Sequence, residues 1–153
     1  MLKAHRIYGV TGCVKHYRGV VSDKLQGGGA HKSVRTGGMG TQIAGTRAPD
    51  LNVLDAIWVN ATPGTGPRCN DDDAARLNIV VAGIDPCAVD AWATRNILMH
   101  AARLQGHEDL SKLDPDNDDL ESHGGWLRLS AEVLREAGHR ATLDEGRMNV
   151  YIA

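Results

Sequence analysis

The stretch LNIVVAGIDPCAVDAWATRNIL, residues 77–98, decides the fold class. Its first eight residues, 77–84, are nearly all apolar and rich in β-branched side chains, which predicts a strand buried on both faces. Asp85 follows as a helix N-cap, and Pro86 suits the first position of a helix that runs to about Leu104. A strand that leads directly into a capped helix is typical of an α/β fold.

Other segments supply further strands and helices around this unit. The expected elements are a short helix over 10–21, a loop over 24–45 with a short helix around 39–44, a strand over 51–59, an amphipathic helix over 126–137 that Gly138 ends, and a closing edge strand over 148–152. Strands that alternate with helices indicate a layered mixed sheet with flanking helices. We expect a single α/β domain over residues 1–153.

Composition and charge exclude several classes of function. The net charge is −2 and the Lys and Arg residues are scattered, which argues against nucleic acid as a partner. No apolar run has the length of a membrane span and the N-terminus lacks a signal-peptide layout, so we expect a cytoplasmic protein with no membrane partner. Cys13, Cys69 and Cys87 form no Cys-x-x-Cys pair, which indicates reduced thiols and no iron–sulfur cluster in this chain.

Three residues near the N-terminus combine the chemistry of a site. His5 is a candidate acid or base, and Lys15 is a candidate nucleophile or covalent tether if burial disfavours its charge. His31 follows three glycines, where bare backbone amides can turn toward an anion. Residue types alone leave a second interpretation open, in which the three are unrelated surface residues.

Acidic residues elsewhere allow two interpretations each. Asp90 lies one turn into the expected helix, where a carboxylate suits the helix dipole, or it orients a Lys or His of the site. The run 114–118 resembles the start of a calcium loop, but Asp119 and Gly125 stand where that loop has Gly and Glu. A solvated acidic loop is the better interpretation of that run.

A set of motifs carries a family resemblance. Lys3-x-His5, then the GVTG run at 9–12, Lys15, Gly19 and His31 are similar to the central signature of the DUF362 family. Later blocks follow in the same order, namely Asp55-Ala56-Ile57, Gly66-Pro67 and Asp85-Pro86-x-Ala88-Val89-Asp90. The resemblance is strongest over 3–100, His16 stands where the family favours Asn, and 105–153 is expected to be a variable extension.

The resemblance favours a site at the matched residues but implies no named reaction. Together with the residue chemistry, the candidate assignments are catalytic roles for His5 and Lys15, a metal-binding role for His31, and cofactor-binding roles for Lys15, Thr11, Gly12 and Asp90. Members usually have further sequence before this signature, and many carry iron–sulfur modules. We therefore expect a C-terminal portion of the domain, completed by a partner or by a second copy in a homo-oligomer.

A weaker similarity in spacing points to the nickel-pincer lactate racemases. It implies that Lys15 tethers the cofactor, His31 ligates nickel and His5 is the acid or base. Two hypotheses of function follow. The first is a domain that binds a small anionic substrate or cofactor, with or without a metal. The second is a non-catalytic accessory subunit that completes an iron–sulfur protein or a missing N-terminal half.

Overall fold

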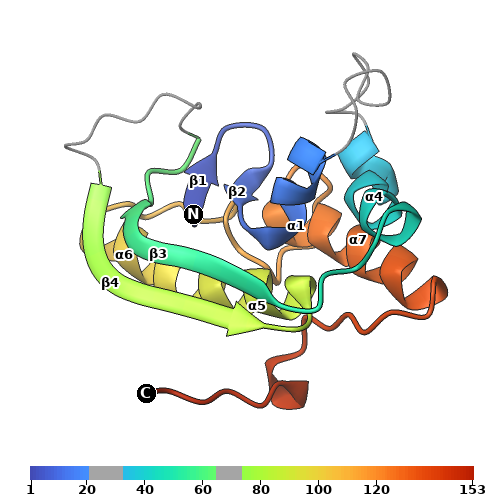
Figure 1. The fold of residues 1–153 in the computed structure, drawn as a ribbon. Helices are drawn as coiled ribbons and strands as arrows, with labels where there is room; N and C mark the ends of the chain where they lie inside the picture. The colour runs from blue at the N-terminus through green and yellow to red at the C-terminus, as the bar shows by residue number, and fades with distance from the viewer. Residues whose placement is uncertain (21–32, 65–73) are drawn as a thin grey trace.

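A mixed sheet backed by helices forms the protein, and the computed structural model describes residues 1–20, 33–64 and 74–153 (Figure 1). The sheet has four strands in the order β2-β1-β3-β4. The strands are β1 (Lys3–His5), β2 (Gly9–Thr11), β3 (Asn52–Asn60) and β4 (Ala74–Gly83). β1 is antiparallel to β2 and parallel to β3, which is antiparallel to β4. The predicted layered α/β fold is confirmed.

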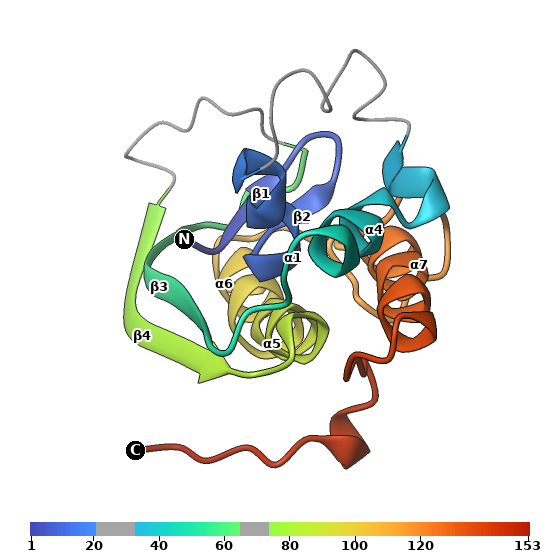
Figure 2. The same cartoon turned by 45° about the vertical axis from the view of Figure 1, so that its right-hand side comes forward.

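The helices pack on one side of the sheet in two layers. They are α1 (Cys13–His16), α4 (Gly38–Gly45), α5 (Pro86–Ala93), α6 (Met99–Leu104) and α7 (His123–Glu136), with shorter turns η1 (Tyr17–Val20), η2 (Val34–Thr36), η4 (Thr94–Leu98) and η5 (Glu145–Arg147). Figure 2 shows the β3–β4 ribbon, the α5–α6 pair and the α4–α7 pair following one another across the molecule. None of the helices described is long and apolar enough to cross a membrane.

Helix α5 has both of its faces buried. Val89 and Ala93 pack with Leu54 of β3 in one apolar core. Cys87 and Ala91 pack with Trp126 of α7 in a second core. The helix begins as predicted, because Oδ1 of Asp85 accepts hydrogen bonds from the backbone amides of residues 87 and 88 at 2.9 and 3.1 Å. The thiols of Cys13 and Cys87 are buried and free, whereas Cys69 lies outside the described residues.

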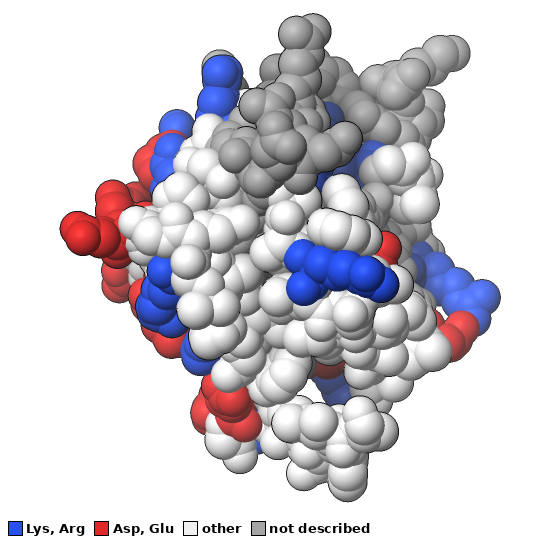
Figure 3. Space-filling view, turned by 90° about the vertical axis from the view of Figure 1, so that its left-hand side faces the viewer, with Lys and Arg blue, Asp and Glu red and all other residues white. Residues whose placement is uncertain are grey.

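The prediction that residues 77–84 are buried on both faces is wrong. β4 is the last strand of the sheet, and Val80 and Ile84 are each 58% exposed. Helices cover only the inner face, so the outer face of β3 and β4 stays open, and Figure 3 shows this side of the molecule as largely uncharged. A continuous apolar run does not distinguish a central strand from an uncovered edge strand.

Several other predicted elements are confirmed, one is present in part and one is wrong. The strand over 51–59 and the helices around 39–44, over 126–137 and from 86 to 104 are present, the last with an unpredicted π-helical turn, η4. The short helix over 10–21 is present in part, because residues up to Thr11 pair with β1, α1 begins at Cys13, and the 3-10 turn η1 continues it to Val20. The closing strand over 148–152 is wrong, because that segment pairs with no strand among the described residues.

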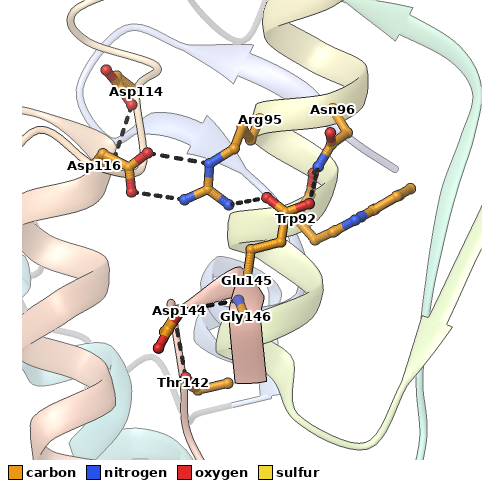
Figure 4. Close-up of polar contacts among 9 residues, drawn as sticks. All are labelled: Trp92, Arg95, Asn96, Asp114, Asp116, Thr142, Asp144, Glu145 and Gly146. Atoms are coloured by element: carbon orange, nitrogen blue, oxygen red, sulfur yellow. Dashed lines mark hydrogen bonds and ion pairs between the residues drawn. The ribbon is translucent and has the colours of Figure 1, made fainter. Parts of the chain in front are cut away.

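Arg95 anchors the C-terminal segment to the helical layer (Figure 4). Its Nη2 and Nε donate to the carboxylate of Asp116 at 2.7 and 3.2 Å, and its Nη1 donates to Glu145 at 3.1 Å. The guanidinium thus bridges the acidic loop and η5. Asp114 accepts from the backbone amide of Asp116, and no group of carboxylates in the described ranges is arranged to hold a metal ion. The acidic loop is therefore an anchor for Arg95.

Candidate functional site

His5 and Lys15 meet at the ring of Tyr8. The centre of the His5 imidazole lies 5.0 Å from the centre of the Tyr8 ring, and Nζ of Lys15 lies 5.1 Å from it. β1 carries His5, the turn between β1 and β2 carries Tyr8, and α1 carries Lys15. The structure thus brings two of the three predicted residues together, whereas His31 lies outside the described residues.

The β1–β2 turn orients the His5 ring. Nδ1 accepts hydrogen bonds from the backbone amides of Ile7 and Tyr8, both at 3.2 Å. A ring nitrogen that accepts carries no proton, so the neutral imidazole has its proton on Nε2. The turn therefore fixes both the tautomer and the direction of the histidine.

Positive charges gather around Lys15. Burial, and then repulsion from Lys3 and Arg18, lower the pKa of the Lys15 ammonium. The pKa of His16 is lowered by burial, by the N-terminal amine, and by the charges of Lys15 and Lys3. We call Lys3, Lys15 and Arg18 the cationic cluster, and the His5 ring lies against the same tyrosine as Lys15. In the part of the chain that the structure describes, no carboxylate forms an ion pair with Lys3 or Lys15.

Asp90 holds the start of α1 in place. This side chain is fully buried, and its two oxygens accept from the backbone amides of Cys13 and Val14 at 2.6 and 2.9 Å. Burial raises the pKa of the Asp90 carboxyl to about 7. A Cβ atom on Gly12 would lie 2.3 Å from Oδ1 of Asp90, so the close approach requires glycine. Asp90 and Gly12 thus position the helix that carries Lys15.

These contacts decide how the predicted cofactor-binding residues are interpreted. Asp90 binds backbone amides and does not contact the Lys15 ammonium through any hydrogen bond in the described residues. Thr11 is 4% exposed, and its hydroxyl has no hydrogen-bond partner in the described ranges. It lies directly opposite Lys3 in the β1–β2 pair, so both side chains project from the same face. Cofactor binding by Thr11, Gly12 and Asp90 stays a prediction.

A cavity of about 230 Å³ lies beside the same tyrosine. Tyr8 and Trp126 form part of its wall, and an ion pair between Arg35 and Glu121 lies at its edge. The Trp126 indole donates from Nε1 to the carbonyl oxygen of Tyr8 at 2.5 Å. α7 therefore supports the turn that orients His5, a contribution that the sequence did not predict.

His123 is a second buried titratable group close to this turn. Its ring is fully buried and lies edge-on to Trp126 with centres 4.9 Å apart. Nε2 lies 3.4 Å from the Thr94 hydroxyl, and Nδ1 has no partner among the described residues. Burial lowers the pKa of His123 to about 3. The imidazole is therefore neutral in the folded protein at neutral pH.

Replacing His123 by glutamine is expected to change how stability depends on pH. The unfolded chain binds a proton on this histidine near pH 6.5, whereas the folded protein does so only near pH 3. The contribution of the neutral His123 to the free energy of unfolding is therefore complete above pH 6.5 and is lost as the pH falls toward 3. Between pH 7 and pH 4, the free energy of unfolding of the wild type should fall by about 3 kcal/mol relative to that of His123→Gln. Urea unfolding at both pH values measures this, with the exposed His100→Gln as the control. Parallel curves for wild type and His123→Gln would contradict it.

Comparison with known families names the group to which the chain belongs. The model of the DUF362 family, a domain of unknown function, matches residues 1–95. The chain belongs to the DUF362 family. Comparison with curated proteins and with solved structures finds no match. The DUF362 match includes the cationic cluster, Tyr8 and Asp90, whereas α7 lies beyond it. The similarity to nickel-pincer racemases receives no support.

Proposed function

We propose that this DUF362 domain binds a small anionic ligand at the cationic cluster. The observation that carries the proposal is that Lys15 is half-buried beside Lys3 and Arg18, so that burial and then these two charges lower its pKa, while no carboxylate in the described residues pairs with Lys3 or Lys15. Like charges held together cost free energy, and a bound anion removes that cost. The cluster is therefore suited to binding an anion.

The side chains, and not the end of α1, recognise the anion. Asp90 already accepts from the amides of Cys13 and Val14, so these amides do not bind a ligand. The ammonium groups of Lys3 and Lys15 and the hydroxyl of Thr11 are donors on neighbouring elements. Compact ammonium charges and a hydroxyl suit a phosphate or carboxylate oxygen. A small oxyanion, free or as part of a larger substrate, is the ligand class that fits.

Chemical roles for two residues extend this proposal. A lysine whose pKa is lowered by burial and by like charges is a better nucleophile or covalent tether than an exposed lysine. His5, held in one tautomer by the turn, is suited to proton transfer near neutral pH. We assign Lys15 as the nucleophile or tether and His5 as the acid or base, for a reaction whose substrate contains the anion.

Replacing Lys15 by methionine is expected to weaken phosphate binding about tenfold, because a hydrogen bond to a charged group is lost from a half-buried site. Isothermal titration of the protein with inorganic phosphate measures the affinity. Lys112→Met, on an exposed loop, is the matched control and should bind as the wild type does. If phosphate and small carboxylates give no heat and no shift in melting temperature with the wild type, the proposal is wrong. The accessory-subunit hypothesis would then be favoured.

A further inference from the structure

The edge of β4 that faces away from β3 has no strand partner. β4 is the last strand in the sheet order, and along its ten residues every backbone ladder contact in the described part of the chain is with β3. Figures 1 and 2 show β4 at the outer margin of the molecule. Unpaired amides and carbonyls along an edge are a template for another strand.

The second half of this edge lacks two of the features that natural proteins use to prevent pairing. From Leu77 to Ile84 there is no charged residue and no proline, although both are common on edges that stay single. A bulge at Asn78, with φ at 57°, is the only irregularity in the described part of β4. The five residues of β4 after that bulge therefore form a regular strand whose edge carries neither a charge nor a proline.

An apolar surface continues around the edge. Val80 is 58% exposed on β4, and Val53 and Trp58 are 62% and 51% exposed on β3, with the exposed Asp55 directly opposite Val80 as the one acid of β3 among them. Figure 3 shows this side as a broad uncharged surface crossed by one basic side chain. Exposed apolar patches of this kind mark interaction surfaces.

The C-terminal segment, 148–153, forms the far wall of a groove beside β4. The groove has a volume of about 1130 Å³ and is lined by Ile79 to Ile84 on one side and by Val150 to Ile152 on the other. Tyr151 and Ile152 are 92% and 87% exposed. The groove is thus open and lies along the unpaired strand edge, with apolar side chains from β4 and the C-terminal segment and with Arg135, Arg140 and Arg147 also in its lining.

We infer that β4 pairs with β4 of a second copy of this chain, in an antiparallel pair that joins the two sheets. A strand edge is complementary to itself when it is turned by a two-fold axis, which is the symmetry of most homodimers. The C-terminal segment of each copy then covers the exposed side chains of the other. In such a dimer the backbone edge of β4 pairs with the same edge of the second copy. The apolar side chains of the two copies are covered in the same contact.

Charge supports a second copy as the occupant. Arg76 is the one charged residue of β4, and its guanidinium lies 5.8 Å from the Trp58 ring of its own sheet. With the two-fold axis at Val80, Val80 faces its own counterpart and Arg76 lies opposite Ile84 of the second copy, so like charges do not meet along the strand pair. The net charge of −2 adds little repulsion between copies.

The size of the surface also agrees with a dimer. β4, the C-terminal segment and the exposed apolar residues of β3 together supply on the order of 20 residues, and stable interfaces take about 20 to 30 from each partner. An isolated β4–β4 contact without the C-terminal segment would be smaller than this. The segment is therefore part of the interface.

Sedimentation velocity over a concentration series tests the inference. The wild type should be a dimer at micromolar concentration, and Val80→Lys should raise the dimer dissociation constant by about 100-fold, because two lysines would be buried at the centre of the interface. Leu104→Lys, at an exposed position 72% accessible at the end of α6, is the matched control and should leave the dimer intact. Circular dichroism and melting temperature verify that both variants are folded.

Crosslinking locates the interface independently of dimer strength. In a Cys69→Ser background, a short bis-maleimide should join two copies of Val80→Cys but not two copies of Leu104→Cys. A wild type that is monomeric at all concentrations overturns the inference, and the edge would then take the protein's own C-terminal segment or another protein. A dimer that survives Val80→Lys and gives no crosslink at residue 80 overturns it as well. Neither experiment contains phosphate, so the result is separate from that of the proposed function.

Discussion

Asp90→Ala should lower the free energy of unfolding by about 4 kcal/mol, the largest effect expected of any polar substitution in this protein. Two buried amides, those of Cys13 and Val14, would lose their acceptor, and each buried donor without a partner costs about 1–3 kcal/mol. The removed carboxylate also leaves a cavity between α5 and α1. The start of α1 would then lose the contact that positions Lys15.

Urea unfolding at pH 7 measures this loss. Asp118→Ala, on an exposed part of the acidic loop, is the matched control and should change stability by less than about 0.5 kcal/mol. Asp90→Asn keeps one acceptor oxygen but places an amide donor against a backbone amide, so its stability should lie between those of wild type and Asp90→Ala. A loss below about 1 kcal/mol for Asp90→Ala would refute the positioning role of Asp90.

The same carboxyl gives a pH dependence opposite to that of His123. The pKa of Asp90 rises from 3.8 in the unfolded chain to about 7 in the folded protein, so the folded state holds the proton more tightly. The part of the stability that comes from this tighter proton binding is complete below pH 3.8 and is lost as the pH rises through about 7. The hydrogen bonds from the amides of Cys13 and Val14 are a separate contribution. His123 contributes in the other direction over the same range. The two slopes offset each other in the wild type, and each single variant exposes the other residue's slope.

Gly9→Ala should destabilise the protein by about 3 kcal/mol or more. Gly9 has a φ of +72°, which side chains other than hydrogen rarely adopt. A Cβ atom there would lie 2.2 Å from the carbonyl oxygen of Lys112 and 3.0 Å from the amide nitrogen of His123. Both contacts are with backbone, so the loop before α7 would have to move together with the β1–β2 turn.

Thermal and urea unfolding of Gly9→Ala test this cost. Gly45→Ala is the matched control, because a Cβ atom at Gly45 meets nothing within 4 Å and its φ is not positive. Alanine at the end of α4 should be neutral or stabilising by up to about 1 kcal/mol. Equal stabilities for Gly9→Ala and wild type would show that the turn and the loop before α7 are not in tight contact.

Local sequence signals predicted the elements well and their surroundings poorly. Asp85 caps α5 through amides only two and three residues away, so the sequence around it was sufficient. Asp90 accepts from amides 77 and 76 residues away, which no local pattern reveals. The apolar run of β4 gave the correct strand and the wrong burial, because burial depends on which helices cover the sheet.

The sequence named candidate site residues but left their arrangement open. Whether His5 and Lys15 come together could not be predicted, and Tyr8, the ring near which both lie, was missed. One signal was present, since aromatic residues make up only 4% of the chain and Tyr8 lies three residues after His5 in a turn. The Trp126 contact that supports this turn comes from α7, outside the family match, and could not be predicted from the signature.

The two buried faces of α5 have a consequence for how the chain folds. Neighbouring residues of this helix face different cores, with Val89 packed toward the sheet and Asp90 toward α1. Neither core is complete until α5 is in place, and α5 is not shielded from water until both have formed. The sheet and the α4–α7 layer therefore fold and unfold as one cooperative unit, in which the family-matched segment depends on a helix that lies beyond it.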